Sequence, residues 1–360
     1  MHYSAYLAYF PKITYQRHKR LLSYFLNKKN IADAELDEFT KAGWETSIAA
    51  EFISWREQNP IEKYDEELTK QNIKTVSLGE TNYPSLLAEI NDPPQTLFYR
   101  GTLDAESAPA LAVVGTRRYT VYGKHVCEKI VGPLAQQGML IVSGLALGID
   151  GIAHQTTLNN HGKTIAVLGS GIDPTHVYPA THRQLAEKII SSGGAIISEY
   201  PPNFAPTQYS FPARNRIIAG LSLGTLVVEA AEASGALITA KCALDYNREV
   251  FGIPHAITST TGAGVNNLIK LGAKVVTTSA DITEALNLKN LKDIVSNRQI
   301  LPSSPAESSI LAILSREPKH IDFIIKETGL DSPTINGTLT LMEMKGMIKN
   351  VGNMTYVMMF

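Results

Sequence analysis

Arginines that stand close to glycines and hydroxyl side chains are the residues of this chain whose types and spacing fit a chemical task, and that task is anion binding. Arg117 and Arg118 follow Gly115, directly after an apolar run. Glycine lets the backbone approach a ligand closely, and a guanidinium can hold a phosphate through two hydrogen bonds. The pattern predicts a phosphate contact at Arg117. A solvated turn with two surface arginines is the alternative.

Arg214, Asn215 and Arg216 form a second group, near the start of a segment that we expect to be a helix. Cations in the first turn oppose the helix dipole by about 0.3–1 kcal/mol each, so a bound phosphate would explain them. Ion pairs with Glu199 or Glu229 at neighbouring strand ends are the alternative, and both interpretations can hold together. We expect Arg117 and Arg214 to contribute to binding, with little effect on fold stability.

A third anion-binding segment is expected at the start of another helix. Ser234 and Gly235 resemble a helix cap, and Thr239 and Lys241 follow in the first turns. Exposed N–H groups and the positive end of the helix dipole favour an anion there. Ordinary N-capping is the alternative.

Three weaker candidates remain: an aromatic residue, a pair of small residues and an Asp-His pair. Phe211 could stack on a base, which contributes about 1–3 kcal/mol per base, or be a core residue. Ser143 and Gly144 place small residues at the end of an expected strand. Asp150 and His154 are spaced i, i+4 and could be a catalytic dyad; a capping aspartate with a nearby histidine is the alternative.

Enzyme signatures are otherwise missing from the sequence. The run His161-Gly-Lys-Thr164 resembles the end of a phosphate-binding loop, but Thr157 stands where that motif needs glycine. The run Gly169-Ser-Gly171 lacks the third glycine of a dinucleotide fingerprint, and the nine histidines show no metal-ligand spacing. We therefore expect no catalytic residues, no metal and no cofactor.

The candidate residues follow short apolar runs that alternate with helical patterns between about residues 110 and 277. This alternation predicts a parallel sheet covered on both faces, with a ligand crevice at the carboxyl ends of its strands. The seven expected strands are 111–115, 140–144, 164–169, 195–199, 225–229, 249–253 and 273–277.

Composition shifts divide the 360 residues into four parts. We expect a small helical domain at 1–72, a Rossmann-like, doubly wound, mostly parallel α/β core at 73–286, a linker at 287–306 and a winged helix at 307–360. The winged helix is indicated by three helical patterns followed by two β-like runs.

Charge and cysteine usage limit the class of protein. With 33 Lys plus Arg against 34 Asp plus Glu, the net charge is −1, so a nucleic-acid site must be a local patch. Cys127 and Cys242 lie far apart, in helical patterns, which fits a reducing cytoplasm rather than a disulfide framework. No leader-like start and no stretch of about 20 apolar residues is present, so we expect neither secretion nor membrane insertion.

Taken in order, the motifs resemble the DprA/Smf family over about residues 83–273. The matching segments are Val113-Val-Gly-Thr-Arg117, Ser143-Gly-Leu-Ala-Leu-Gly-Ile-Asp150, Phe211-Pro-Ala-Arg-Asn-Arg-Ile-Ile-Ala-Gly220, Val227-Val-Glu229 and Ser234-Gly-Ala-Leu-Ile-Thr-Ala240. The resemblance implies a core that binds single-stranded DNA, dimerises, and loads the RecA recombinase during natural transformation. It also implies a sterile-alpha-motif-like N-terminal domain and a winged-helix C-terminal domain.

Three departures and two rival hypotheses accompany this resemblance. His255, His182 and the apparent insertion Thr175-His176 differ from the family pattern and leave the local loops open. One rival is a nucleotide-processing enzyme similar to the nucleoside-monophosphate phosphoribohydrolases, in which Glu229 would take part, although the tandem glycines of that motif are missing. The other is a scaffold whose winged helix binds duplex DNA or protein.

Overall fold

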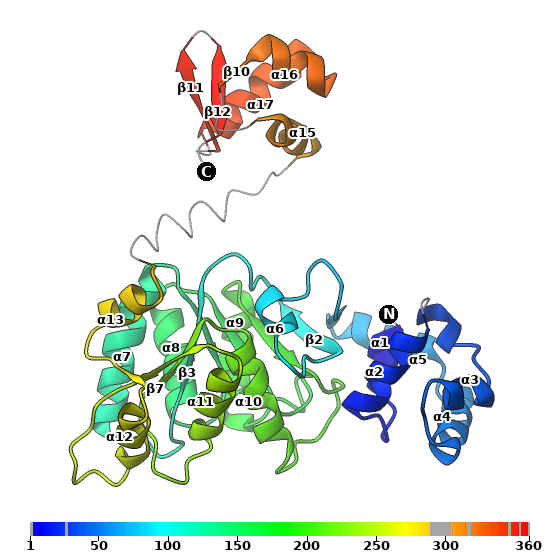
Figure 1. Cartoon of the computed structure of the whole chain (residues 1–360), viewed down its shortest axis with the longest axis vertical. Coiled ribbons are helices and arrows are strands. Elements are labelled where there is room, and N and C mark those ends of the chain that lie inside the picture. The colour runs from blue at the N-terminus through cyan, green and yellow to red at the C-terminus, as the bar shows by residue number, and fades with distance from the viewer. Residues whose placement is uncertain are drawn as a thin grey trace. The chain divides into compact units, whose positions relative to one another are not determined.

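The computed structural model describes residues 3–25, 28–288, 304–314, 318–344, 347–352 and 354–358. The chain divides into two compact units, Met1–Lys289 and Asn290–Phe360. Figure 1 shows a helical segment and a helix-covered sheet in the first unit, and a small helical and β-stranded fold in the second.

A nine-stranded sheet forms the centre of the first unit, in the order β1-β2-β6-β5-β4-β3-β7-β8-β9. The seven strands from β3 to β9 are parallel to their neighbours among themselves, and all seven occur where the sequence predicts them. The strands are β1 (Lys74–Ser77), β2 (Thr96–Gly101), β3 (Ala110–Val114), β4 (Leu140–Ser143), β5 (Thr164–Val167), β6 (Ala195–Ser198), β7 (Gly224–Val227), β8 (Glu249–Gly252) and β9 (Lys274–Val275).

The strand order reverses between β3 and β7. From β3 the chain proceeds through β4 and β5 to β6 on one side, and from β7 it proceeds through β8 to β9 on the other. The strands β3 to β7 are almost fully buried because helices cover both faces, which is why they are continuous apolar runs. A doubly wound sheet of this kind has its ligand crevice at the reversal point, outside the carboxyl ends of the strands.

Strands β1 and β2 were not predicted from the sequence. They pair antiparallel with each other, and β2 pairs antiparallel with β6. The sequence Lys74-Thr-Val-Ser of β1 is short and mixes exposed and buried positions, so it lacks the apolar run that marks the buried strands. The mostly parallel sheet thus carries an antiparallel edge.

Helices follow the parallel strands in turn and form two layers. Helix α7 packs on α8 and α8 on α9, whereas α10 packs on α11. The helices are α6 (Ser85–Ala88), α7 (Val121–Gln136), α8 (Ile149–Asn159), α9 (Arg183–Ser191), α10 (Ser210–Gly220), α11 (Ala236–Asp245), α12 (Ala263–Lys270) and α13 (Ser279–Ala285).

Five α-helices occur in the described part of the expected N-terminal domain, and they pack around a cluster of aromatic side chains that includes Phe10, Phe39, Trp44 and Phe52. The segment also docks on the core, since the Ser4 hydroxyl lies 2.8 Å from that of Thr96 in β2. The five are α1 (Tyr3–Leu7), α2 (Tyr15–Tyr24), α3 (Leu36–Lys41), α4 (Thr46–Gln58) and α5 (Ile61–Lys70).

Within its described residues, the second unit has three helices and a three-stranded sheet in the order β10-β12-β11. Its first helix begins at Pro305, with Ser304 as the N-cap, so the last two residues of the expected linker are helical. Most of the expected linker, 289–303, lies outside the described residues. The elements are α15 (Pro305–Ile313), β10 (Lys319–His320), α16 (Ile321–Thr328), α17 (Ser332–Met344), β11 (Ile348–Gly352) and β12 (Thr355–Met358).

Among the described residues, no helix combines the length and the apolar character needed to cross a membrane.

Candidate functional site

A cleft of about 640 Å³ lies where the strand order reverses. Its walls are the loop after β3, the start of α8, the start of α10 and the start of α11. The residues named from the sequence that line it are Arg117, Phe211, Arg214, Asn215, Ser234, Gly235 and Thr239. The structure therefore brings seven of the eleven expected site residues to one crevice.

Arg117 is an exposed cation at the rim of this cleft. Its guanidinium carbon lies 5.5 Å from the centre of the Phe211 ring, so the ring supports the charge by a cation–π contact. Gly148, at φ +85°, makes the loop possible, because a Cβ there would meet the Thr116 carbonyl oxygen at 2.2 Å. The close approach also lets the Ile149 N–H donate to that oxygen. Arg118 lines the same cleft.

Arg214 does not lie in the first turn of its helix, where the sequence predicts it as a phosphate contact. Helix α10 begins at Ser210, so Arg214 lies in its second turn, where the dipole argument no longer applies. The side chain is 4% exposed, and Nη1 donates to the carbonyl oxygens of Gly144, at 2.6 Å, and Val167. Burial lowers the pKa of Arg214 to about 10, so it stays charged at neutral pH. Arg214 forms the floor of the cleft, and both hydrogen bonds of its Nη1 go to carbonyl oxygens inside the protein.

Arg216 also lies inside the protein, on the side of α10 away from the cleft residues. It pairs with Glu199 at the end of β6, and its Nε lies 3.4 Å from an Asp92 carboxylate oxygen. Burial raises the pKa of Glu199, and the neighbouring Arg216 opposes that rise. The ion pair with Glu199 is thus confirmed as one of the two interpretations of this arginine, and Arg216 is not among the residues that line the cleft.

Ser143 and Gly144 have structural roles, because their polar groups are hydrogen-bonded inside the protein. Ser143 is fully buried and donates its hydroxyl to the Val113 carbonyl at 2.6 Å, which excludes it from the cleft surface. The Gly144 N–H donates to Asp150 at 3.2 Å while its carbonyl receives Arg214. The sequence correctly indicated a need for small residues here, but the reason is the close packing of Arg214.

The start of α11 forms one side of the cleft. Gly235 is the N-cap residue, and the Ser234 hydroxyl accepts a hydrogen bond from the Ala236 N–H at 3.3 Å. Asn215 ties α10 to this turn, since its amide donates to the Gly235 carbonyl at 3.3 Å. Lys241 is exposed but is not one of the residues that line the cleft.

Asp150 and His154 do not form a dyad. Asp150 binds the Gly144 N–H, and burial raises its pKa against the attraction of Arg214. His154 is fully buried, and its Nδ1 lies 2.7 Å from the Thr164 hydroxyl. That hydroxyl donates its one proton to the Ile141 carbonyl, so Nδ1 of His154 must carry the proton. Burial lowers the pKa of His154 to about 3, which keeps the ring neutral.

Glu229 is fully buried beneath the start of α7. Its Oε2 accepts hydrogen bonds from the Thr120 N–H and hydroxyl, at 3.0 and 3.2 Å. A Cβ on Gly123 would lie 2.0 Å from the same oxygen, so the glycine is needed for this arrangement. The carboxylate thus holds the N-terminus of α7 and does not line the cleft.

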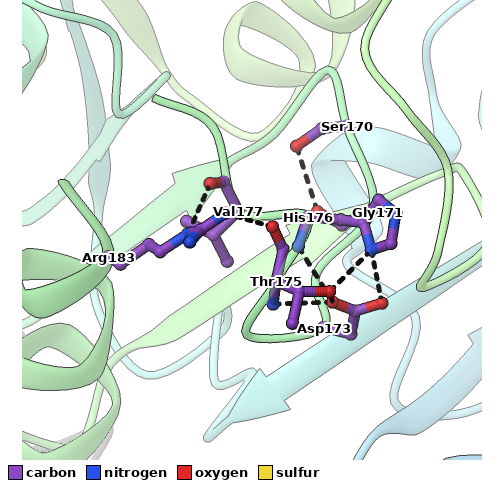
Figure 2. A network of polar contacts seen from close by, with 7 residues as sticks. All are labelled: Ser170, Gly171, Asp173, Thr175, His176, Val177 and Arg183. Atoms are coloured by element: carbon purple, nitrogen blue, oxygen red, sulfur yellow. Dashed lines mark hydrogen bonds and ion pairs between the residues drawn. The ribbon is translucent and has the colours of Figure 1, made fainter. Parts of the chain in front are cut away.

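The Thr175-His176 segment belongs to a hydrogen-bonded turn between β5 and α9 (Figure 2). Asp173 accepts hydrogen bonds from the Thr175 N–H and hydroxyl and from the His176 N–H, at 2.7–2.9 Å. Its other oxygen lies 2.7 Å from Nδ1 of His176. Burial opposes ionisation, but these hydrogen bonds hold the pKa of Asp173 below its usual range. Arg183 donates to the carbonyls of Thr175 and Val177 and fixes the outgoing chain.

The other two departures from the family pattern are also ordered. The His255 ring lies 2.9 Å from the Val228 carbonyl through Nε2, and it meets the Tyr122 ring edge to face at 5.1 Å. Nδ1 of His182 lies 2.8 Å from the Leu145 carbonyl. Both histidines therefore pack against loops at the carboxyl ends of the strands.

Sequence reasoning missed Gln208, Ile238 and Tyr178 near the cleft. Gln208 and Ile238 line the cleft itself, and Tyr178 lines a small hollow beside Phe211. Tyr178 could have been found, because an aromatic residue directly after a strand-end turn is a candidate stacking residue. Gln208 and Ile238 carry no such signal, since polar and apolar residues of these types are common on helix and loop surfaces.

No group of His, Cys, Asp and Glu side chains able to hold a metal occurs within the described parts of the chain. Cys127 is buried and Cys242 half-buried, and both are free thiols.

Two family models match the chain. The model described as DNA recombination-mediator protein A covers residues 74–287, and the DprA winged helix domain covers residues 296–353. The second match agrees with the three helices and small sheet of the C-terminal unit.

Similar proteins agree with these models. Protein Smf of Escherichia coli is 39% identical over 290 residues, which span 79% of this chain and 77% of that protein. DNA processing protein A of Streptococcus pneumoniae superposes with a TM-score of 0.68 at 35% identity, over 79% of this chain and 97% of that one. The Helicobacter pylori protein, described by its single-stranded DNA binding mode, gives a TM-score of 0.53 at 30% identity, over 60% and 95%.

Proposed function

The chain belongs to the family of DNA recombination-mediator protein A, also called DprA or Smf, and from that premise we propose that it binds single-stranded DNA without catalysing a reaction on it. The cleft at the strand reversal carries this proposal. It presents two exposed arginines, an aromatic ring and the start of α11 to one ligand. Phosphates require cations and N–H groups, and bases require a ring or a flat guanidinium on which to stack.

Arg117 and Arg118 contact the phosphates in this proposal, with the Ser234-Gly235 turn as a third contact. Arg214 acts as a positioning residue that holds the loop after β4 against the end of β5. Lys241, which is exposed on α11, adds attraction without lining the cleft. Binding is therefore insensitive to base sequence, because these contacts reach the backbone rather than the base edges.

The enzyme alternative loses its main support in the placement of Glu229. A catalytic carboxylate must reach the substrate, whereas this one is fully buried and already accepts hydrogen bonds from Thr120, the N-cap residue of α7. The buried His154 cannot act as its partner base, since it too has no exposed surface.

We further propose that the bound strand is protected and passed to the RecA recombinase, in the cytoplasm, during uptake of transforming DNA. The family description as a recombination mediator supports this step. RecA filament formation on single strands coated with a single-strand-binding protein should accelerate when the chain is added. Acceleration that disappears in an Arg117→Ala variant would tie loading to the cleft, whereas no acceleration with the wild type would refute loading.

A homodimer through the core is also proposed. Large apolar side chains lie exposed around α12 and β9, at the edge of the sheet: Ile257 is 98% exposed, Leu271 83% and Val275 46%. An exposed edge strand with such residues favours pairing with a second copy. Light scattering after size exclusion should give a dimer mass for the wild type and a monomer mass for Leu271→Asp.

The proposed function is tested by titrating the full chain with a labelled single strand and with the matching duplex, each with and without added nucleotide. We expect preference for the single strand, no effect of nucleotide and no turnover. Duplex preference would support the scaffold hypothesis, and turnover of the nucleotide would support the enzyme hypothesis.

A further inference from the structure

We propose that the single strand leaves the cleft past Tyr178 and continues in a second groove between α7, α8 and α9. This inference rests on the proposed function, and it adds the route of the bound strand over the surface and the length of strand that is bound. The groove has a volume of about 740 Å³ and lies in the helical layer that follows β3, β4 and β5.

The cleft and the groove are joined at Arg117. This residue lines the cleft, the groove and a small hollow of about 30 Å³ between them. Ala146 lines the cleft and the hollow, and Leu147 lines the hollow and the groove. A strand held at Arg117 therefore finds a continuous depression toward α9 rather than a wall.

Tyr178 provides an aromatic surface at this junction. Its side chain is 48% exposed, and its ring centre lies 5.6 Å from that of Phe211 at an interplanar angle of 50°. Because the two rings are tilted, they do not cover each other, and Tyr178 keeps a surface on which a base can stack. Asp173 and Arg183 hold together the turn that ends at Val177 (Figure 2), and Tyr178 is the next residue in the chain.

The groove beyond Tyr178 has the chemistry of a phosphate-binding track. Lys124 projects from α7 and Lys188 from α9, while Gln155 and Asn159 of α8 line it with amides. Glu128 is the acidic residue among those that line it, and it lies 3.9 Å from Lys124. Lysines are depleted from protein–protein interface cores, so cations from two separate helices favour a nucleic-acid backbone over a protein partner.

The inference is tested with oligothymidylates of about 4 to about 16 nucleotides, the range of site sizes known for single-strand-binding folds. For the wild type, affinity should rise with length as the strand extends from the cleft into the groove. Tyr178→Ala should weaken binding of the long oligonucleotides about tenfold, through lost stacking, and leave the shortest ones within about twofold. Lys188→Glu should lower the salt slope of long-strand binding by about 0.7 or more.

Matched controls separate the groove from general effects. Tyr178→Phe keeps the ring and should bind like the wild type. Lys129→Glu changes an exposed lysine of α7 that does not line the groove, and Lys163→Glu changes one at the amino end of β5, the opposite end of the sheet. Both should retain wild-type affinity and salt slope at every length.

The outcomes distinguish the proposed path from the proposed function. If the groove variants weaken short and long strands equally, or weaken neither, the proposed path is wrong, while binding in the cleft still stands. A wild-type chain that binds no single strand of any length would overturn the proposed function as well.

Discussion

The guanidinium of Arg214 occupies the space that a side chain on Gly144 would need. A Cβ at residue 144 would lie 2.5 Å from two guanidinium nitrogens, and Nη1 donates to the Gly144 carbonyl at 2.6 Å. This contact joins the second turn of α10 to the loop after β4, 70 residues away in the chain. It holds the floor of the cleft in place and leaves the exposed Arg117 as the cation of the rim.

Arg214→Ala should destabilise the fold by about 1–3 kcal/mol, because the Gly144 and Val167 carbonyls lose their buried donor. Gly144→Ala should have a similar cost, through the steric conflict. Urea unfolding measures both, with the exposed Arg118→Ala as the control that should unfold like the wild type. Wild-type stability of Arg214→Ala would show that this arginine does not hold the cleft together.

That prediction reverses the expectation from the sequence, which assigned Arg214 to DNA contact with little effect on stability. The seven parallel strands and the loops that follow them are identifiable, because apolar runs and glycines mark them. The roles of the three site arginines cannot be identified from the sequence. Arg117, Arg214 and Arg216 have the same chemistry in the sequence, and only the packing of α10 shows which of them is exposed. The edge strand β1 was missed because a short, partly polar strand lacks a distinctive period. Its neighbour β2 was missed because only its first three residues are buried, a run too short to show one.

His154 should make the fold sensitive to acid. Its pKa is about 6.5 when unfolded and about 3 when buried, so the unfolded chain takes up a proton first as the pH falls. This contribution to stability is complete above pH 6.5 and is lost toward pH 3, at up to about 1.4 kcal/mol per pH unit. His154→Asn can keep a donor for the Thr164 hydroxyl and cannot titrate, so its stability should fall less steeply over this range.

The matched control is His161→Asn, which changes an exposed histidine at φ +57°, a conformation that asparagine tolerates. Its pH dependence should follow that of the wild type. Equal slopes for His154→Asn and wild type in urea unfolding between pH 6.5 and pH 4 would mean that His154 is not the acid-sensitive group.

Glu229 should not act as a catalytic residue in the hydrolysis of nucleoside monophosphates. The purified chain should release no free base from nucleoside monophosphates, because the buried carboxylate cannot reach a substrate. Glu229→Gln keeps one oxygen that can accept from Thr120 and should retain single-strand binding. Base release that persists through purification and is abolished in Glu229→Gln would make the enzyme hypothesis the better one.

The C-terminal unit should be an accessory module. The sequence of α17 contains neither lysine nor arginine, and its Asn336 amide donates to the Ser332 carbonyl of the same helix. Helices that read a DNA groove usually present Lys, Arg, Asn or Gln side chains to bases and phosphates. A fragment of residues 304–360, which keeps the Ser304 cap, should not bind duplex DNA at micromolar concentration in physiological salt.

Conversely, residues 1–289 should bind single strands within about twofold of the full chain, since they form a compact unit that contains the whole cleft. Micromolar or tighter duplex binding by the 304–360 fragment would contradict the accessory role. Loss of single-strand binding by the truncated chain would contradict it too.

The central claim is that the Arg117 rim of the cleft binds the phosphates of a single strand. Its most direct test is the salt dependence of binding for wild type and Arg117→Ala, with Lys163→Ala as the control at the other end of the sheet. We predict that Arg117→Ala weakens binding of all base sequences alike and makes the slope of log K against log salt shallower by about 0.7, with unfolding unchanged. An Arg117→Ala variant with the wild-type affinity and slope would contradict the account.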